Sequence, residues 1–490
     1  MKELFLLIVI LLPISGGILI PILPFHNRKQ MTIYTEIIVV LNAILVWILL
    51  LYTPKETFTI MEFTGNLKLA LHMDGLSQVF AGLISFLWPF ATLYSFEYMK
   101  HEKHEKPFFL FYVAAYGITL GISLSANVLT MYLFYEMLTL ITVPLVIHTL
   151  LREAILAARK YMYYSLGGAA FAFIGVVFLI VYGQTSNFVF GGVLDLTKVG
   201  EQKNILLWVY VFTFFGFGVK AAIFPFHSWL PKAGVAPTPV TALLHGVAVV
   251  KSGVFAIIRI TYYSFGMDFL RETWSQDVVM AAAIITIIYG SCMAIKERHL
   301  KRRLAYSTIS NLSYILFGVT IMTPHGLVGA LCHLVFHALM KISSFFCAGA
   351  VIYKTGKNYV YELNELGKKM PKVFTIFTLS GLSLMGVPGF CGFISKYHLA
   401  MAAVESEKMI AYIGIGALLI SSFLSAVYIF SILVRAFYLP ADLEYHKRKE
   451  GEDPNWLMLF PLSIFAAMII LFGIFSTPVI TVFENIATGH

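Results

Sequence analysis

Long apolar stretches of about 20 residues recur along the whole chain, and short polar segments separate them. A stretch of this length crosses the hydrocarbon core of a bilayer as one α-helix. Only 12% of the residues are charged, about half the share of a soluble domain. We therefore predict an all-α integral membrane protein. Its basic residues lie mainly in the loops, so we expect no nucleic-acid partner despite a net charge of +9.

The apolar pattern predicts fourteen membrane spans. The first follows a lysine, as in a secretory signal peptide, but it is too long and lacks a cleavage site of small residues, so we interpret it as a span. The chain ends soon after the last span, so we expect no long lateral helix there. The predicted spans are residues 4–24, 32–52, 75–98, 107–125, 128–150, 154–182, 204–231, 236–262, 276–295, 304–322, 325–353, 372–402, 408–438 and 457–484.

Segments that contain proline interrupt two of these spans, residues 220–231 with Pro225 in the seventh and residues 386–396 with Pro388 in the twelfth. Proline removes a backbone donor and clashes with the preceding turn, so we expect both helices to break. Because the breaks lie five spans apart, we predict two five-helix repeats that are inserted in opposite directions. The predicted units are residues 1–106 (N-terminal helices), 107–262 (first repeat), 263–438 (second repeat) and 439–490 (last helix).

Lysine and arginine are unevenly distributed between the two sides of the predicted membrane. The odd-numbered connections hold twenty-three of them and the even-numbered connections hold seven. Cytoplasmic loops carry the excess of basic residues. We therefore predict a multi-pass protein of the cell (cytoplasmic) membrane with both termini extracytoplasmic.

Ionisable side chains inside the predicted spans are the candidate functional residues. One charged side chain at the bilayer centre costs about 2.5–3.5 kcal/mol, so several would cost on the order of 10 kcal/mol unless they are paired or hydrated. Their presence is more simply explained if the protein uses these residues for its function than if it merely tolerates their cost. The selected residues are Glu136, Lys220, Lys251, His333, His337, Lys341 and Lys396, with His245 as a weaker candidate.

Glu136 lies well inside the fifth predicted span, and Lys220 lies roughly 24 Å along the seventh, before an apolar segment. The structural alternatives are a glutamate that bonds a neighbouring helix and a lysine that reaches the end of its own helix. A facing glutamate–lysine pair would satisfy both charges. At 4 Å and an effective dielectric constant of about 20, such a pair attracts by about 4 kcal/mol. A small movement of the carboxylate would then make the lysine release its proton.

His333, His337 and Lys341 are spaced four residues apart, which predicts one face of the eleventh span. Imidazole donates and accepts protons near neutral pH, so this row favours a proton relay over buried structural histidines. Two histidines at this spacing also suit zinc. No acidic or thiol ligand accompanies them, so we expect no metal site.

Four further positions have weaker patterns. We interpret Lys251 as the central relay, while His245, six residues earlier, does not share its helical face. Lys396 follows the second break and is the candidate terminal site, the alternative being a lysine that reaches out from the end of a half-helix. Asp74 opens the third span and is equally well explained as a helix N-cap.

Several motifs support a family resemblance when they are taken together. They are Asp-Gly-Leu-Ser at 74–77, Glu136, the proline-rich segments 224–231 and 236–240, the basic segment 300–310, the His337–Lys341 run and Gly-Phe-Ile-Ser-Lys at 392–396. With these motifs nearly the whole chain resembles the antiporter-like membrane subunits of respiratory complex I, of Mrp-type cation/proton antiporters (their D subunit) and of membrane-bound hydrogenases.

This resemblance implies a fourteen-helix core with two inverted repeats. It implies that Glu136 and Lys220 form the coupling pair, that Lys251 and the histidines form the central relay, and that Lys341 and Lys396 lie towards the exit. It also implies no redox centre or other cofactor in this chain. The four cysteines fit that expectation, because they lie in or beside apolar spans without metal-ligand spacing.

Three functions stay open. The main expectation is a subunit that moves protons, or sodium against protons, in a redox-driven complex with other membrane subunits and with ferredoxin- or NADH-oxidising peripheral subunits. The alternative is a subunit of a redox-free Mrp-type sodium/proton antiporter. The third is an inert scaffold, and the intact row of ionisable residues argues against it.

Overall fold

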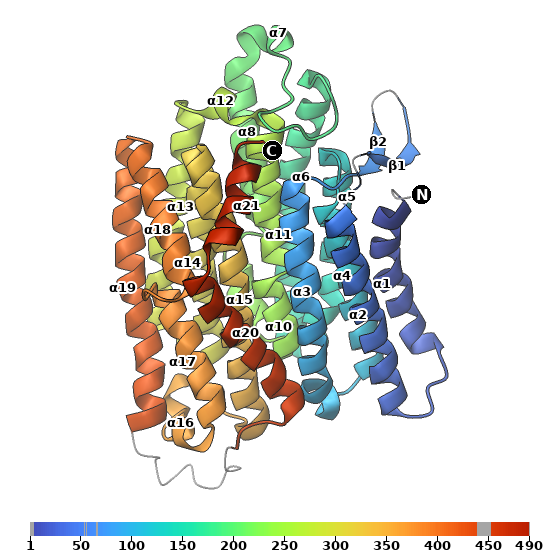
Figure 1. Cartoon of the computed structure of the whole chain (residues 1–490), viewed down its shortest axis with the longest axis vertical. Coiled ribbons are helices and arrows are strands. Elements are labelled where there is room, and N and C mark those ends of the chain that lie inside the picture. Colours follow the sequence, from blue (N-terminus) through green and yellow to red (C-terminus); the bar gives the residue numbers. More distant parts are fainter. Residues whose placement is uncertain (1–3, 53, 55, 65–66, 439–451, 490) are drawn as a thin grey trace.

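The computed structural model describes residues 4–489 except 53, 55, 65–66 and 439–451. Its helices run side by side along the long axis of the molecule (Figure 1). Twelve helices in the described part are long and apolar enough to cross a membrane, so the chain is a multi-pass membrane protein. They are α1 (Leu4–Ile22), α2 (Arg28–Tyr52), α3 (Gly75–Tyr98, extended by η1, Met99–His101), α4 (Glu105–Ser123), α5 (Val128–Val146), α6 (Arg152–Tyr182), the composite Thr238–Phe265, α13 (Trp274–Lys296), α14 (Leu300–Ile321), α15 (Pro324–Thr355), α19 (Met409–Tyr438) and α20 (Trp456–Ile474).

The other two predicted spans are the two expected to be interrupted, at Pro225 and Pro388, and both are broken. In the first, α8 (Lys203–Gly218) ends seven residues before Pro225, and turns lead to the short α9 (Trp229–Ala233). In the second, α17 (Pro371–Met385) is closed by Gly386, whose φ of +90° is a conformation that glycine adopts without strain. α18 (Cys391–Glu405) then follows. The predicted breaks are confirmed, and the inverted repeats stay a prediction based on their spacing.

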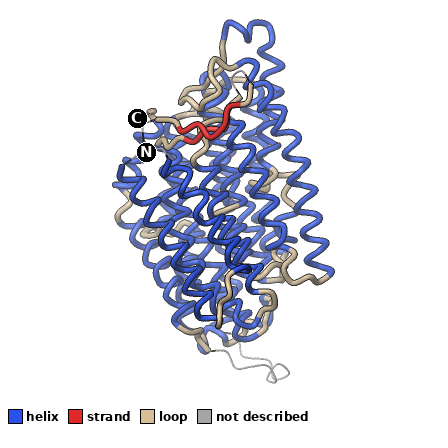
Figure 2. The backbone as a smooth tube through the Cα atoms, turned by 90° about the vertical axis from the view of Figure 1, so that its right-hand side faces the viewer, coloured by secondary structure: helices blue, strands red, loops and turns tan. Residues whose placement is uncertain are grey.

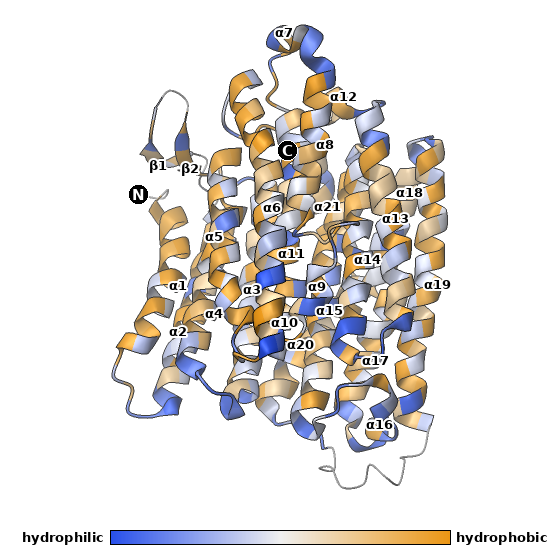
Figure 3. Cartoon of the chain, turned by 180° about the vertical axis from the view of Figure 1, so that it is seen from behind, coloured by the Kyte–Doolittle hydropathy of each residue, from blue (hydrophilic) through white to orange (hydrophobic). Residues whose placement is uncertain are grey.

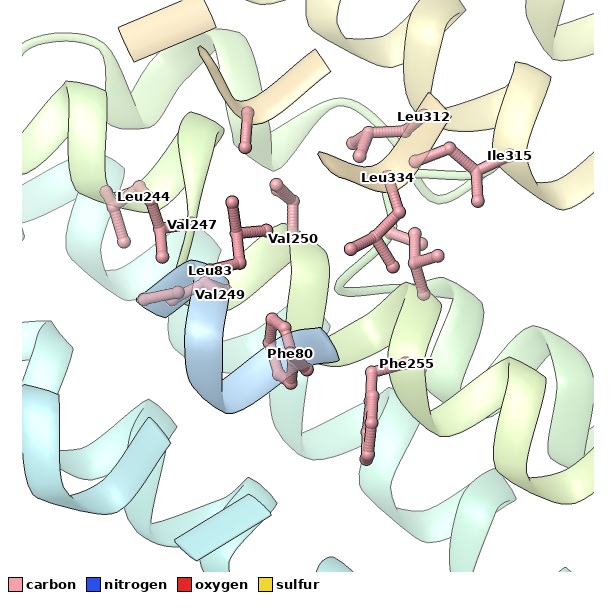
Figure 4. Close-up of a cluster of buried hydrophobic side chains, with 14 of the residues drawn as sticks. Phe80, Leu83, Leu244, Val247, Val249, Val250, Phe255, Leu312, Ile315 and Leu334 are labelled. Carbon is pink, nitrogen blue, oxygen red and sulfur yellow. The ribbon is translucent and has the colours of Figure 1, made fainter. Parts of the chain in front are cut away.

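A third break was not predicted. The span expected at 236–262 consists of α10 (Thr238–Gly246), α11 (Val249–Ile258) and the π-helix η3 (Arg259–Phe265). At its centre the Val247 and Ala248 amides both donate to the Leu243 carbonyl, at 3.2 and 2.9 Å. Figure 4 shows the apolar side chains that surround this break, including Val247, Val249 and Val250. No proline lies at the break, so the sequence carries no strong local signal for it.

The ends of the bundle carry the remaining elements. The last predicted span is two helices, α20 and α21 (Thr477–Ala487), because Pro478 starts a new helix there. One small hairpin departs from the all-α prediction (Figure 2). The elements at the ends are β1 (Phe58–Glu62), β2 (Lys68–Leu71), α7 (Leu196–Val199), η2 (Gly200–Gln202), α12 (Met267–Leu270), η4 (Val360–Glu362) and α16 (Leu366–Lys369).

Both described ends of the chain lie towards the end of the bundle that carries α7 and the hairpin (Figure 1). An even number of crossings requires such an arrangement, and which side of the membrane this end faces stays a prediction. The predicted boundary at residue 439 and the basic residues Lys447, Arg448 and Lys449 lie outside the described residues.

Apolar residues cover most of the length of the helices, and hydrophilic residues gather mainly towards the two ends (Figure 3). Three residues that were counted with the loop charges are instead buried: Arg259, Lys301 and Arg303, at 1%, 6% and 7% exposed. Arg259 binds both carboxylate oxygens of Asp74, at 2.5 and 2.7 Å. Asp74 also accepts a 2.9 Å hydrogen bond from the Ser77 amide, so its N-cap role is confirmed and an ion pair is added. Lys301 donates to the Ala236 carbonyl at 2.8 Å.

Candidate functional site

The three breaks and α15 bring most of the predicted ionisable residues into the interior. Six of these residues are fully buried, each at 0% exposed. Packed protein surrounds them, so each of their charges or protons has to be satisfied by a neighbouring group. They are Lys220, His245, Lys251, His333, His337 and Lys341.

Lys220 and Glu136 form an ion pair at the first break. Lys220 lies two residues after the end of α8, and its Nζ is 4.0 Å from Oε1 of Glu136 on α5. Nζ also donates to the Tyr135 carbonyl and lies 3.3 Å from the centre of the Tyr135 ring. The lysine side chain is 1% exposed and the glutamate side chain 22%. The ammonium is therefore held by a carboxylate, a carbonyl and an aromatic face, while the carboxylate keeps more freedom to move.

Lys251 and His337 are in direct contact across the middle of the molecule. Nζ of Lys251, in the first turn of α11, lies 2.9 Å from Nδ1 of His337 on α15. The His337 ring is stacked 5.7 Å from the ring of His333, one turn earlier. His333 continues to α18, where its Nδ1 lies 2.8 Å from Oγ of Ser395. These contacts connect the third break to the second.

Lys341 does not continue this series of contacts. Its Nζ donates to Oγ of Ser307 at 2.6 Å and to the Leu304 carbonyl at 3.3 Å, both on α14. Residues four apart on an α-helix differ by about 40° around the axis, so Lys341 is rotated by about 80° from His333. The three residues lie on one continuous helix, as their spacing predicts, but their hydrogen-bond partners differ. His337 contacts α11 and His333 contacts α18, while Lys341 donates to α14, which the His333 ring also approaches at 5.1 Å from the ring of Tyr314.

Lys396 lies at the second break and is partly buried. Its Nζ donates to the carbonyls of Leu384 and Met385 at 2.7 and 3.0 Å, and to Oγ of Ser422 at 2.9 Å. An ammonium has three donors, and here all three are used. The side chain thus binds the carbonyl end of the half-helix α17, where the helix dipole favours a cation.

Neither ring nitrogen of His245 has a hydrogen-bond partner among the described residues. It lies at the end of α10, and its ring is 4.7 Å from the ring of Phe345. No group of three His, Cys, Asp or Glu side chains that suits a metal occurs in the part of the chain that the structure describes.

Sequence reasoning missed the neutral partners of this site. Tyr135, Ser307, Ser395 and Ser422 each contact one of the ionisable residues. Only Ser307 and Ser395 lie in segments that were singled out, at 300–310 and 392–396. Serine and tyrosine inside an apolar helix are common, so their role is visible only when the lysine that they face is known.

Two family models match this chain. The model described as "NADH:quinone oxidoreductase/Mrp antiporter, TM" matches residues 125–425. The model described as "NADH-Ubiquinone oxidoreductase (complex I), chain 5 N-terminus" matches residues 61–109. The first match includes every predicted site residue.

Curated relatives are named as antiporter subunits. The A subunit of the Na(+)/H(+) antiporter of Alkalihalophilus pseudofirmus is 28% identical over 493 residues, which cover 94% of this chain and 60% of that protein. The A1 subunit of the Na(+)/H(+) antiporter of Staphylococcus aureus is 29% identical over 498 residues, which cover 96% and 61%. The chain thus spans about three fifths of the length of these relatives. Both are A-type subunits, whereas the motifs suggested a resemblance to the D-type.

Two solved structures share the fold. One is the archaeal membrane-bound sulfane sulfur reductase, a respiratory membrane complex, with a TM-score of 0.85 and 22% identity over 99% of this chain and 97% of the matched chain. The other is the Mrp complex from Dietzia sp. DQ12-45-1b, with a TM-score of 0.85 and 18% identity over the same shares. At these identities the likeness describes the fold.

Proposed function

Because the chain belongs to the NADH:quinone oxidoreductase/Mrp antiporter transmembrane family, we propose that it is an ion-translocating subunit of a multisubunit sodium/proton antiporter. The observation that carries this proposal is the ion pair between Glu136 and the fully buried Lys220, at the break that follows α8. A buried lysine with one movable counter-charge takes up a proton when the carboxylate is near and releases it when the carboxylate moves away.

The released proton then needs acceptors inside the protein. Lys251, His337 and His333 supply them between the third break and Ser395, next to Lys396. Imidazole accepts a proton on one ring nitrogen and donates from the other. Lys396 is the terminal carrier in this proposal, and water from the facing side of the membrane takes the proton from it.

The redox-driven alternative has less support. The curated relatives are named sodium/proton antiporter subunits, and the likeness to a respiratory complex lies at 22% identity. Solved relatives from both kinds of assembly are multisubunit membrane complexes, which supports other membrane subunits as partners. Peripheral subunits that oxidise ferredoxin or NADH are not part of the proposal.

The test is to isolate the native assembly, identify its chains and reconstitute it in proteoliposomes with a pH-sensitive dye inside. We expect an imposed sodium gradient to drive proton movement without any electron donor, and we expect no iron–sulfur or hydrogenase-like chain in the assembly. Transport that requires a reductant, together with such chains, would favour the redox-driven complex instead.

Replacing His337 with alanine is expected to slow exchange by roughly tenfold without abolishing it. Loss of a positioned acid–base group typically costs 10²–10⁴-fold, but water can bridge one missing member between Lys251 and His333. The readout is the initial rate of sodium-driven proton movement. The matched control is His325→Ala, because His325 lies on the same helix but pairs with Glu405 at the surface. An unchanged rate for the His337 variant would make the histidines structural.

A further inference from the structure

Lys341 binds α14 rather than the histidines, yet it is as deeply buried as they are. Oγ of Ser307, to which its Nζ donates, also lies 2.6 Å from the Tyr428 hydroxyl on α19. Tyr428 in turn donates to Oγ of Ser425 at 3.0 Å. A lysine, two serines and a tyrosine therefore form one continuous hydrogen-bonded line that runs from α15 through α14 to α19.

A second line of hydroxyls leads to Lys396. It ends beside Ser422, the serine on α19 that binds Lys396 and directly follows Ser421 in the sequence. Tyr314 donates to Oγ of Ser421 at 2.6 Å, and its ring lies 5.3 Å from Nζ of Lys396. Ser421 is also bonded to Ser310 and Ser291 at 3.0 and 2.6 Å. We call seven of these residues the hydroxyl cluster, each at most 1% exposed: Ser291, Ser307, Ser310, Tyr314, Ser421, Ser425 and Tyr428.

The two lines meet one helical turn apart on α19. In the structure Ser425 donates to the backbone carbonyl of Ser421 at 2.8 Å. A carbonyl accepts a hydrogen bond but has no proton to pass on, so the route is interrupted there. The two serines are four residues apart and lie on one face of the helix. A proton route through both serines requires the Ser425 hydroxyl to turn from this carbonyl towards the Ser421 hydroxyl, which is a side-chain movement alone.

We propose that the hydroxyl cluster is a second proton route, which leads from Lys341 to Lys396 separately from the histidines. In this route Tyr428 is the residue that joins Ser307 to Ser425. Each hydroxyl accepts one proton and gives up another, so every oxygen ends as it began. The net step converts the Lys341 ammonium to an amine and the Lys396 amine to an ammonium. This inference rests on the proposed function, because it adds carriers to the same translocation.

A purely structural role for the cluster predicts a different outcome. Buried serine and tyrosine hydroxyls also hold helices together, at about 1 kcal/mol per hydrogen bond. In that case removing one oxygen lowers stability without regard to Lys341. If the cluster is a proton route, Tyr428 and Lys341 belong to the same route. A variant that lacks both should then exchange protons no more slowly than a variant that lacks Lys341 alone. Double variants of these two residues therefore distinguish the two roles.

The test is Tyr428→Phe in the reconstituted assembly, which removes one oxygen and keeps the ring. With the histidines intact we expect sodium-driven proton movement to fall by no more than about a tenth, because the tenfold loss expected for His337→Ala leaves only about a tenth of the exchange to any other route. The matched control is Tyr210→Phe. Tyr210 is an equally buried tyrosine whose hydroxyl bonds Thr261, at 3.1 Å, outside the hydroxyl cluster. Should the Tyr428 variant fail to assemble, Ser307→Ala removes the preceding oxygen in its place.

Double variants give the deciding readout. In a Lys341→Ala background, Tyr428→Phe should cause no further slowing, whereas in a His337→Ala background it should remove most of the exchange that remains. Unchanged exchange on adding Tyr428→Phe to His337→Ala, or the same fractional loss in both backgrounds, would overturn the second route. A wild-type assembly that moves no protons in response to sodium would overturn the proposed function, and this inference with it.

Discussion

Lys220→Ala is expected to reduce sodium-driven proton movement to background while the assembly still forms. The 4.0 Å pair of Lys220 and Glu136 is worth about 4 kcal/mol at an effective dielectric constant of about 20, which corresponds to roughly a thousandfold in proton occupancy. Without the lysine, a movement of Glu136 no longer changes the proton affinity of a partner. Folding should survive, because Glu136 is partly exposed and can take up a proton.

Two companion variants separate proton transfer from fixed charge. Glu136→Ala should be equally inactive, since Lys220 then keeps only its contacts with Tyr135. Lys220→Arg keeps the positive charge, but a guanidinium does not release its proton in proteins, so it should also fail. The control is Lys198→Ala, an exposed lysine paired with Asp195. Wild-type exchange by the alanine variants would remove the pair from the mechanism, and exchange by the arginine variant would make Lys220 a fixed charge.

The features that sequence predicted are those that act within one segment. Hydropathy acts over a single run of about 20 residues, so each predicted span corresponds to helix. Pro225 and Pro388 act on the turn before them, so both breaks were foreseen. In the first case the helix ends well before the proline, which leaves Lys220 itself outside regular helix.

The features that sequence missed depend on residues far away in the chain. The break at Val247 and Ala248 has no proline, and it lies among side chains from α3, α14 and α15 (Figure 4). Arg259 is buried because Asp74, 185 positions away, binds it. Lys341 donates to Ser307, which lies 34 positions earlier on another helix. None of these contacts follows from spacing along the sequence.

The ion pair of Asp74 and Arg259 has the largest expected effect on stability. The Arg259 side chain is 1% exposed and that of Asp74 25%. Phe188, Phe255 and Tyr263 surround the guanidinium at 4.6–5.2 Å. Burial raises the pKa of Asp74. The charge and hydrogen bonds of Arg259, together with the hydrogen bonds from Ser77, lower it by more than burial raises it, to about 2.

That lowered pKa sets the pH window of the stabilisation. A carboxylate whose pKa is lower in the folded protein stabilises it fully above the unfolded pKa of about 3.9. The contribution is then lost as the pH falls towards 2, the folded value. Between pH 5 and 8 the pair should therefore add no pH dependence to stability, and a variant that lacks it should differ from wild type by a constant amount.

Asp74→Asn is expected to destabilise the chain by about 3–5 kcal/mol, because it leaves a buried guanidinium without a counter-charge while an amide oxygen still caps α3. The measurement is the free energy of unfolding in mixed micelles. The matched control is Asp195→Asn. Asp195 also caps a helix, but its partner is an exposed lysine, Lys198. That variant should lose less than about 1 kcal/mol. Adding Arg259→Leu to Asp74→Asn should restore most of the stability, since an apolar side chain needs no partner. A double variant as unstable as the single one would contradict the ion pair as the cause and point to the packing around Arg259.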